Sequence, residues 1–140
     1  MTWQGKIDGG VDNDGVGARR FSSTGMALGG DILVNTTLVH AQKASCAAAA
    51  GNGFVVTWQS DKQDGDSWGV FFQRLTTIGV HTGDETQANV YWNKGQQAPA
   101  CAAFSDGSFV LAWEGHDDQD GDKKGVFVRR FDASGLPLYK

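Results

Sequence analysis

Residues 54–59 read Phe-Val-Val-Thr-Trp-Gln, and residues 109–114 read Phe-Val-Leu-Ala-Trp-Glu. Aromatic and branched residues alternate in both stretches at the period of two that is typical of a β-strand. The alternate positions between them are also apolar or nearly so. A strand that is apolar on both faces is covered on both faces, so these stretches decide the fold. We therefore expect Trp58 and Trp113 in the core.

The same tryptophan recurs along the chain. Trp3, Trp58 and Trp113 are spaced 55 residues apart, and each is followed by a similar phrase, at residues 15–21, 69–75 and 125–131. A fixed period of this size indicates a repeat architecture. We divide the single 140-residue domain into copies at approximately 1–43, 44–98 and 99–140.

Each complete copy is expected to contain four short strands. In the second copy they are residues 44–50, 54–59, 70–75 and a more polar edge strand near 85–90. The alanines of the first segment favour a helix when taken alone. The counterpart at residues 100–104 follows a proline and stops at a hairpin-type turn, which favours a strand. The sequence therefore predicts an all-β fold of antiparallel four-stranded meanders, which is typical of β-propeller blades.

The ends of the chain complicate this architecture. Trp3 falls inside a second strand, and the chain stops after a third strand, so we expect about three blades, two of them incomplete. A closed ring usually has four to eight blades. We predict completion by oligomerisation, with a dimer favoured because two chains give about six blades, or membership of a longer array.

Composition excludes some partners. The chain carries a formal net charge of −4 and no Lys/Arg cluster, so we expect no nucleic-acid binding. No apolar run approaches the ~20 residues of a membrane span, so no membrane insertion is expected. The N-terminus lacks the pattern of a signal peptide. The chain is therefore either cytosolic or an excised piece of a secreted protein.

Cys46 and Cys101 are also 55 residues apart and are each followed by alanine. We interpret them as small buried side chains at equivalent positions of two strands. A disulfide between them is the alternative.

Residues 53–61, Gly-Phe-Val-Val-Thr-Trp-Gln-Ser-Asp, followed by residues 64–70, Asp-Gly-Asp-Ser-Trp-Gly-Val, resemble a known type of bacterial repeat. Such repeats form long arrays in very large secreted or surface-attached proteins, often beside calcium-binding and cadherin-like modules. The resemblance covers nearly the whole chain and is lowest in the first copy, where Gly17 and Ala18 replace a bulky pair. It implies a propeller-like fold, an extracellular or cell-surface location and a non-enzymatic adhesive role. It implies no particular ligand.

Three Asp-Gly loops between the second and third strands are candidate calcium sites. Alternating carboxylates with an embedded glycine can converge on one Ca²⁺ ion. The third loop is the most complete candidate and the others are less so; the candidate ligands are Asp118, Asp120 and Asp122, then Asp64 and Asp66, then Asp12 and Asp14. The alternative is a plain hairpin turn with solvated carboxylates, which Lys123 and Lys124 beside the third loop favour.

Trp68, Tyr91 and Trp92 have no aromatic counterparts in the other copies. Core positions tend to recur in a repeat, so we interpret these three as loop residues that bind a ligand. An exposed indole offers a flat apolar face that suits a sugar or a peptide. The alternative is that they cover the sheet or fill a contact between chains. Arg20, Arg74 and Arg130 do recur, and we expect them to bind loop carboxylates or backbone carbonyls of the next blade.

Catalysis has little support, because the three histidines stand at non-equivalent loop positions and no nucleophile lies near a predictable base. We therefore predict a non-catalytic binding module, with a glycan or a protein surface as partner and a lectin-like or adhesin-like role. A structural, self-assembling module of a bacterial surface protein is the second hypothesis. A glycoside hydrolase is the third.

Overall fold

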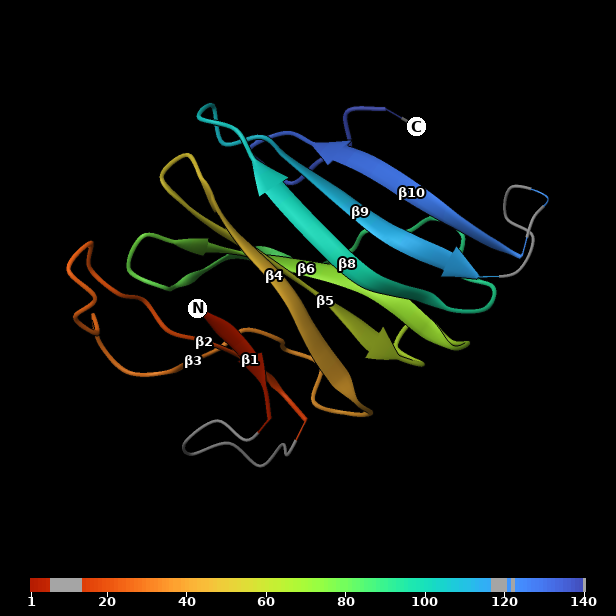
Figure 1. Cartoon of the computed structure of the whole chain (residues 1–140), viewed down its shortest axis with the longest axis horizontal. Helices are drawn as coiled ribbons and strands as arrows, with labels where there is room; N and C mark the ends of the chain where they lie inside the picture. The colour runs from red at the N-terminus through yellow and green to blue at the C-terminus, as the bar shows by residue number, and fades with distance from the viewer. Residues whose placement is uncertain (6–13, 117–120, 122, 140) are drawn as a thin grey trace.

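The computed structural model describes residues 1–5, 14–116, 121 and 123–139, without the side chains of residues 44 and 45. These residues form β-strands and no helix, in three antiparallel sheets (Figure 1). The second sheet lies between the first and the third. No described segment is a helix that could cross a membrane. The predicted all-β, antiparallel fold is confirmed.

Each sheet takes its strands in chain order. The first sheet contains β1 (Thr2–Gln4), β2 (Val16–Ala18) and β3 (Ile32–Leu33). The second sheet contains β4 (Gln42–Ala50), β5 (Gly53–Asp61), β6 (Trp68–Thr76) and β7 (His81–Gln87). The third sheet contains β8 (Gln96–Ala103), β9 (Phe109–His116) and β10 (Lys124–Phe131). The alanine-rich segments are strands, as predicted.

The edge strand β7 departs from its predicted range of 85–90. It begins at His81, because a tight turn after β6 brings the chain straight back. In that turn the Thr76 amide donates to the Val80 carbonyl at 2.8 Å, and Leu75 then pairs with His81. The polar residues of this strand have no alternating pattern that could mark its start.

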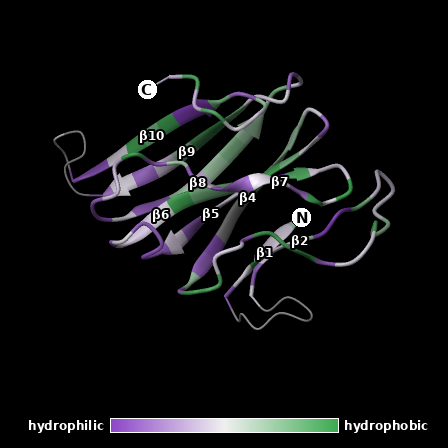
Figure 2. Ribbon diagram, turned by 180° about the vertical axis from the view of Figure 1, so that it is seen from behind, coloured by the Kyte–Doolittle hydropathy of each residue, from purple (hydrophilic) through white to green (hydrophobic). Residues whose placement is uncertain are grey.

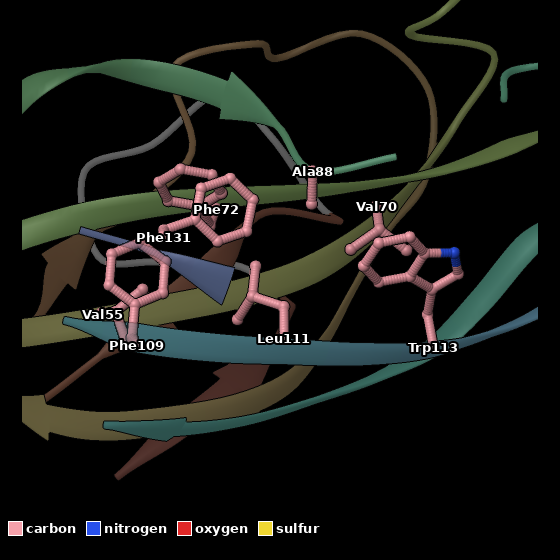
Figure 3. Packing of buried hydrophobic residues seen from close by; sticks show 8 residues of the cluster. All are labelled: Val55, Val70, Phe72, Ala88, Phe109, Leu111, Trp113 and Phe131. Carbon is pink, nitrogen blue, oxygen red and sulfur yellow. The ribbon is translucent and has the colours of Figure 1, made fainter. Parts of the chain in front are cut away.

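Both faces of the second sheet are buried. Val56, Trp58 and Leu75 pack against the first sheet, together with Val16 and Val34. The opposite face packs against the third sheet through a cluster shown in Figure 3, made of Val55, Val70, Phe72, Ala88, Phe109, Leu111, Trp113 and Phe131. Trp58 is fully buried and Trp113 nearly so, which confirms that both belong to the core.

Among the described residues, the third sheet buries one of its two faces. Phe109, Leu111 and Trp113 point toward the second sheet. Val126 and Val128 of β10 face the other way and are 75% and 64% exposed. Figure 2 shows the hydrophobic stretch of β10 at the edge of the stack. The expected cover on both faces is therefore present in the second sheet and absent from the third among the described residues.

The interpretation of the cysteines as unbridged core residues was wrong. Cys46 and Cys101 form a disulfide that joins the second sheet to the third. Cys46 pairs with Thr57 in β5, whereas Cys101 pairs with Leu111 in β9. A shift of one residue in register turns a side chain to the opposite face of a sheet. The two sulfur atoms therefore face each other across the junction.

Candidate functional site

Trp68 closes the loop that joins β5 to β6. It is the first residue of β6 and pairs with Asp61, so its predicted place inside a loop was wrong. The loop is a tight turn in which the Lys62 amide donates to the Ser67 carbonyl at 2.6 Å. Lys62 and Gly65 both have positive φ. The turn projects the side chains at positions 64 and 66 toward the segment after β7.

Asp64 and Asp66 tie this turn to that segment. The Asp64 carboxylate accepts a hydrogen bond from the Gln87 amide at 3.2 Å. Burial raises the pKa of the Asp64 carboxyl, although hydrogen bonds from Asp66 and Asn89 act to lower it. The Asp66 carboxylate accepts from the Lys94 backbone amide at 2.6 Å. Asp64 thus holds the turn against the end of β7, and Asp66 holds it against the segment between β7 and β8.

A buried pair of amides holds the segment between β7 and β8. The Asn89 side-chain oxygen accepts from the Val70 amide at 2.8 Å, and its nitrogen donates to Gln96 at 2.9 Å and to the Tyr91 carbonyl at 3.0 Å. The Gln96 nitrogen donates in turn to the Asn93 carbonyl at 3.2 Å. The buried Asn89 and Gln96 side chains therefore fix the backbone of residues 91–93. A backbone fixed in this way suits a loop that binds a ligand.

The same network occurs between the first and second sheets. Asn35 accepts from the Val16 amide at 2.7 Å and donates to Gln42 at 2.7 Å and to the Thr37 carbonyl at 2.8 Å. Neither pair was predicted from the sequence. The signal is present there, because each asparagine precedes its glutamine by seven residues and the two pairs are 54 residues apart.

The predicted ligand-binding aromatics differ in exposure. Trp92 is 57% exposed and lies in the segment between β7 and β8, where the sequence placed it. Tyr91 lies beside it and is half-buried. Trp68 is half-buried too, and the Lys43 ammonium lies 4.8 Å from its ring centroid. Trp92 is therefore the aromatic side chain most available to a ligand.

A cleft of about 490 Å³ opens where β6 ends, between the turns at residues 51–53 and 105–107. It contains none of the predicted site residues. At the Trp92 end a cleft of about 430 Å³ lies between the 62–67 turn, the 91–95 segment and the end of β9. It is lined by Asp66, Ser67, Asn93, Lys94, Gln97 and His116. Trp68 directly follows one lining residue and Trp92 directly precedes another. Both predicted tryptophans are thus next in sequence to residues that line one polar cleft, although neither is itself a lining residue.

The calcium hypothesis depends mainly on residues outside the described part of the chain. Asp12, Asp118, Asp120 and Asp122 lie there. Among the described residues, no three His, Cys, Asp or Glu side chains gather as a metal site. Asp14 is described and exposed. Calcium binding stays a prediction for the first and third loops.

The sequence predicted all three histidines in loops, but two of them lie at the ends of strands. His81 begins β7, and its Nε2 lies 2.9 Å from the Leu33 carbonyl oxygen. His116 ends β9 and lines the cleft, with its Nε2 3.9 Å from the Glu114 carboxylate.

Comparison of the chain with protein-family models found no match, and a search of curated proteins found no similar sequence. The cleft is therefore interpreted from its own residues.

Proposed function

We propose that this protein is a non-catalytic glycan-binding module. The observation that carries the proposal is the polar cleft of about 430 Å³ lined by Asn93, the residue that directly follows the 57% exposed Trp92. A sugar presents an apolar face of C–H groups and a rim of hydroxyl groups. An indole ring can stack on the apolar face, and fixed amides and carboxylates can bind the hydroxyl groups.

The lining side chains supply both kinds of hydrogen-bonding group. Asp66 offers a carboxylate acceptor, and Asn93 and Gln97 each offer a donor and an acceptor. The buried Asn89 fixes the loop from which Trp92 and Asn93 project. A loop that is fixed before binding loses little conformational entropy when the sugar arrives.

The test is a broad glycan array, probed with and without calcium, followed by calorimetric titration of a bound glycan. We expect Trp92→Ala to weaken binding by at least about tenfold, because a buried aromatic anchor contributes more than about 1.4 kcal/mol. Tyr139→Ala is the matched control, since Tyr139 is a 75% exposed aromatic that is not next in sequence to any residue lining the cleft. An array without any bound glycan, in either condition, would contradict the proposal.

We further propose that the stacked sheets are propeller-like and that the protein works outside the cell, as the resemblance to bacterial surface repeats implies. The disulfide between Cys46 and Cys101 supports this location, because disulfides persist in oxidising compartments. A thiol titration of protein purified from its natural compartment tests it. Two free thiols there would argue for a reducing environment.

A self-assembling structural module is the second candidate function. The specific observation in its favour is the exposed apolar face of the third sheet. In its sequence-based form this hypothesis placed Trp68, Tyr91 and Trp92 between chains. We propose instead that assembly uses the face around Val126 and Val128.

A further inference from the structure

The two junctions between sheets share one arginine contact. The Arg20 guanidinium of the first sheet donates to the Thr77 carbonyl of the second at 2.6 Å. The Arg74 guanidinium of the second sheet donates to the Ala133 carbonyl of the third at 2.7 Å. This confirms the expectation that these arginines bind carbonyls of the next sheet. Each junction thus has one arginine on one sheet and one turn on the next.

The turns that receive these arginines are built alike. Thr77 and Ala133 each lie two residues before a glycine, Gly79 or Gly135, whose φ is 86°. The turn at Ser22–Gly25 in the first sheet has the same construction. Its glycine has a φ of 81°, and its closing amide-to-carbonyl hydrogen bond is 2.8 Å long, as in the other two turns. Ser23 stands where Thr77 and Ala133 stand.

Arg130 is the third arginine of the series. It is exposed, lies over the Phe104 ring with 5.0 Å between guanidinium carbon and ring centroid, and reaches Ser108 Oγ only at 3.5 Å. Among the described residues it has no turn of a further sheet as its acceptor. Likewise, the turn at Ser22–Gly25 receives no arginine from another sheet within the described residues.

The face that surrounds Arg130 is mostly apolar. Strand register places six small or branched side chains on it, from all three strands: Ala100, Ala102, Val110, Ala112, Val126 and Val128. The exposed Glu114 is on the same face, paired with Val126 at the end away from Arg130. Val126 and Val128 hold the places before Arg130 that Val70 and Phe72 hold before Arg74. Val70 and Phe72 are 0% and 1% exposed under the third sheet, whereas the two valines are 75% and 64% exposed. This face therefore has the composition of a covered junction.

The first sheet has the complementary face, which no other described sheet covers. Val16 and Ala18 pack against the second sheet, so Gly17 and its pairing partner Trp3 face away from it. Phe21 follows Arg20 as Leu75 follows Arg74 and Phe131 follows Arg130. Leu75 and Phe131 are buried in the two junctions, but Phe21 is 42% exposed.

We propose that the outer face of the third sheet binds the free face of the first sheet in a second copy of this chain, with Arg130 donating to the Ser23 carbonyl of that copy. The occupant is a second copy because the complementary face and the matching turn lie on the same chain. The contact joins different faces, so it is heterologous and can close into a ring of two chains. It is independent of the proposed glycan cleft, which lies on the loops.

Light scattering on the purified chain tests the proposal. We expect at least twice the mass of one 14.9 kDa chain. Val128→Glu should reduce the mass to that of one chain, and so should Val126→Glu, with the circular dichroism spectrum unchanged. Val39→Glu is the matched control, because Val39 is 61% exposed in a loop outside this face, and it should keep the assembled mass. Arg130→Met should weaken association by about tenfold or more, because it removes a charged donor.

Mixing identifies the partner face. Phe21→Ser breaks the face on the first sheet, and Val128→Glu breaks the face on the third. Each variant alone should be monomeric, but their mixture should form a dimer, since each supplies the face that the other lacks. A monomeric wild type overturns the proposal. An assembled Phe21→Ser variant also overturns it, since the third sheet would then bind itself or another surface.

Discussion

Replacing both Cys46 and Cys101 by alanine is expected to lower the free energy of unfolding by about 4 kcal/mol at 25 °C. The bridge joins residues 55 apart in sequence and on different sheets. Closing a loop of that length removes about 14 cal/mol/K of entropy from the unfolded chain, which gives this figure. Alanine fits the site, because Ala48 and Ala103 already pack in the same junction.

The effect is measured by scanning calorimetry without reductant. A 140-residue chain unfolds with an entropy of about 0.3 kcal/mol/K, so the melting temperature should fall by about 14 °C. Reductant should lower the melting temperature of the wild type similarly and leave the double variant unchanged. A double variant that melts within about 3 °C of the oxidised wild type would refute the reasoning, because it would mean a loss below about 1 kcal/mol.

Four further predictions concern polar groups. Asn89→Ala should cost about 2–3 kcal/mol, because it leaves the buried Val70 amide and the side-chain oxygen of Gln96 without partners, and hydrogen exchange should show residues 91–93 loosened. In carboxyl NMR titrations the pKa of Asp64 should lie above 3.8, because of burial, so its contribution to stability grows as the pH falls through that pKa. Asp106 and Asp132 should titrate with a pKa below 3.8, since they accept hydrogen bonds from Ser108 and Ser134, and their contribution is lost as the pH falls through their lowered pKa. If Asp118, Asp120 and Asp122 hold Ca²⁺, EDTA should lower the melting temperature, and an unchanged melt would argue for a plain turn.

The central strands could be predicted because apolar residues occupy both of their faces. The alternation in residues 54–59 predicted β5, its two apolar faces and the burial of Trp58, and the fold confirms all three. The polar strand β7 could not be placed accurately, because an exposed edge strand needs no alternation. Its start is fixed by the turn closed by the Thr76–Val80 hydrogen bond, and the sign of that turn is the glycine that recurs at Gly25, Gly79 and Gly135 rather than any pattern in the strand itself.

The cysteines show where spacing fails as a guide. Cys46 and Cys101 are as far apart as Trp58 and Trp113, so equal spacing indicated equivalent places on two strands. The register of β4 shifts between Ala44 and Cys46, and that of β8 shifts between Gln97 and Ala100. Each strand gains one residue there, so these irregularities do not distinguish the two cysteines. The hairpin that follows does: it pairs Ala50 with Gly53 in the second sheet but Ala103 with Phe109 in the third, which shifts the pairing of Cys101 by one residue and turns the two side chains toward each other.

Only part of the candidate site could be predicted from the sequence, because only some of its residues break the repeat. Trp92 was identified because it breaks the pattern, and it is the most exposed of the three aromatics. The amides that fix its loop, Asn89 and Gln96, recur as Asn35 and Gln42. They therefore do not stand out among residues that break the repeat. The predicted ligand residues of this chain break the repeat, whereas the side chains that hold the sheets together keep it. Residues that recur hold one sheet to the next, and this is why Arg130, which recurs but binds no further sheet among the described residues, points to a partner rather than to a ligand.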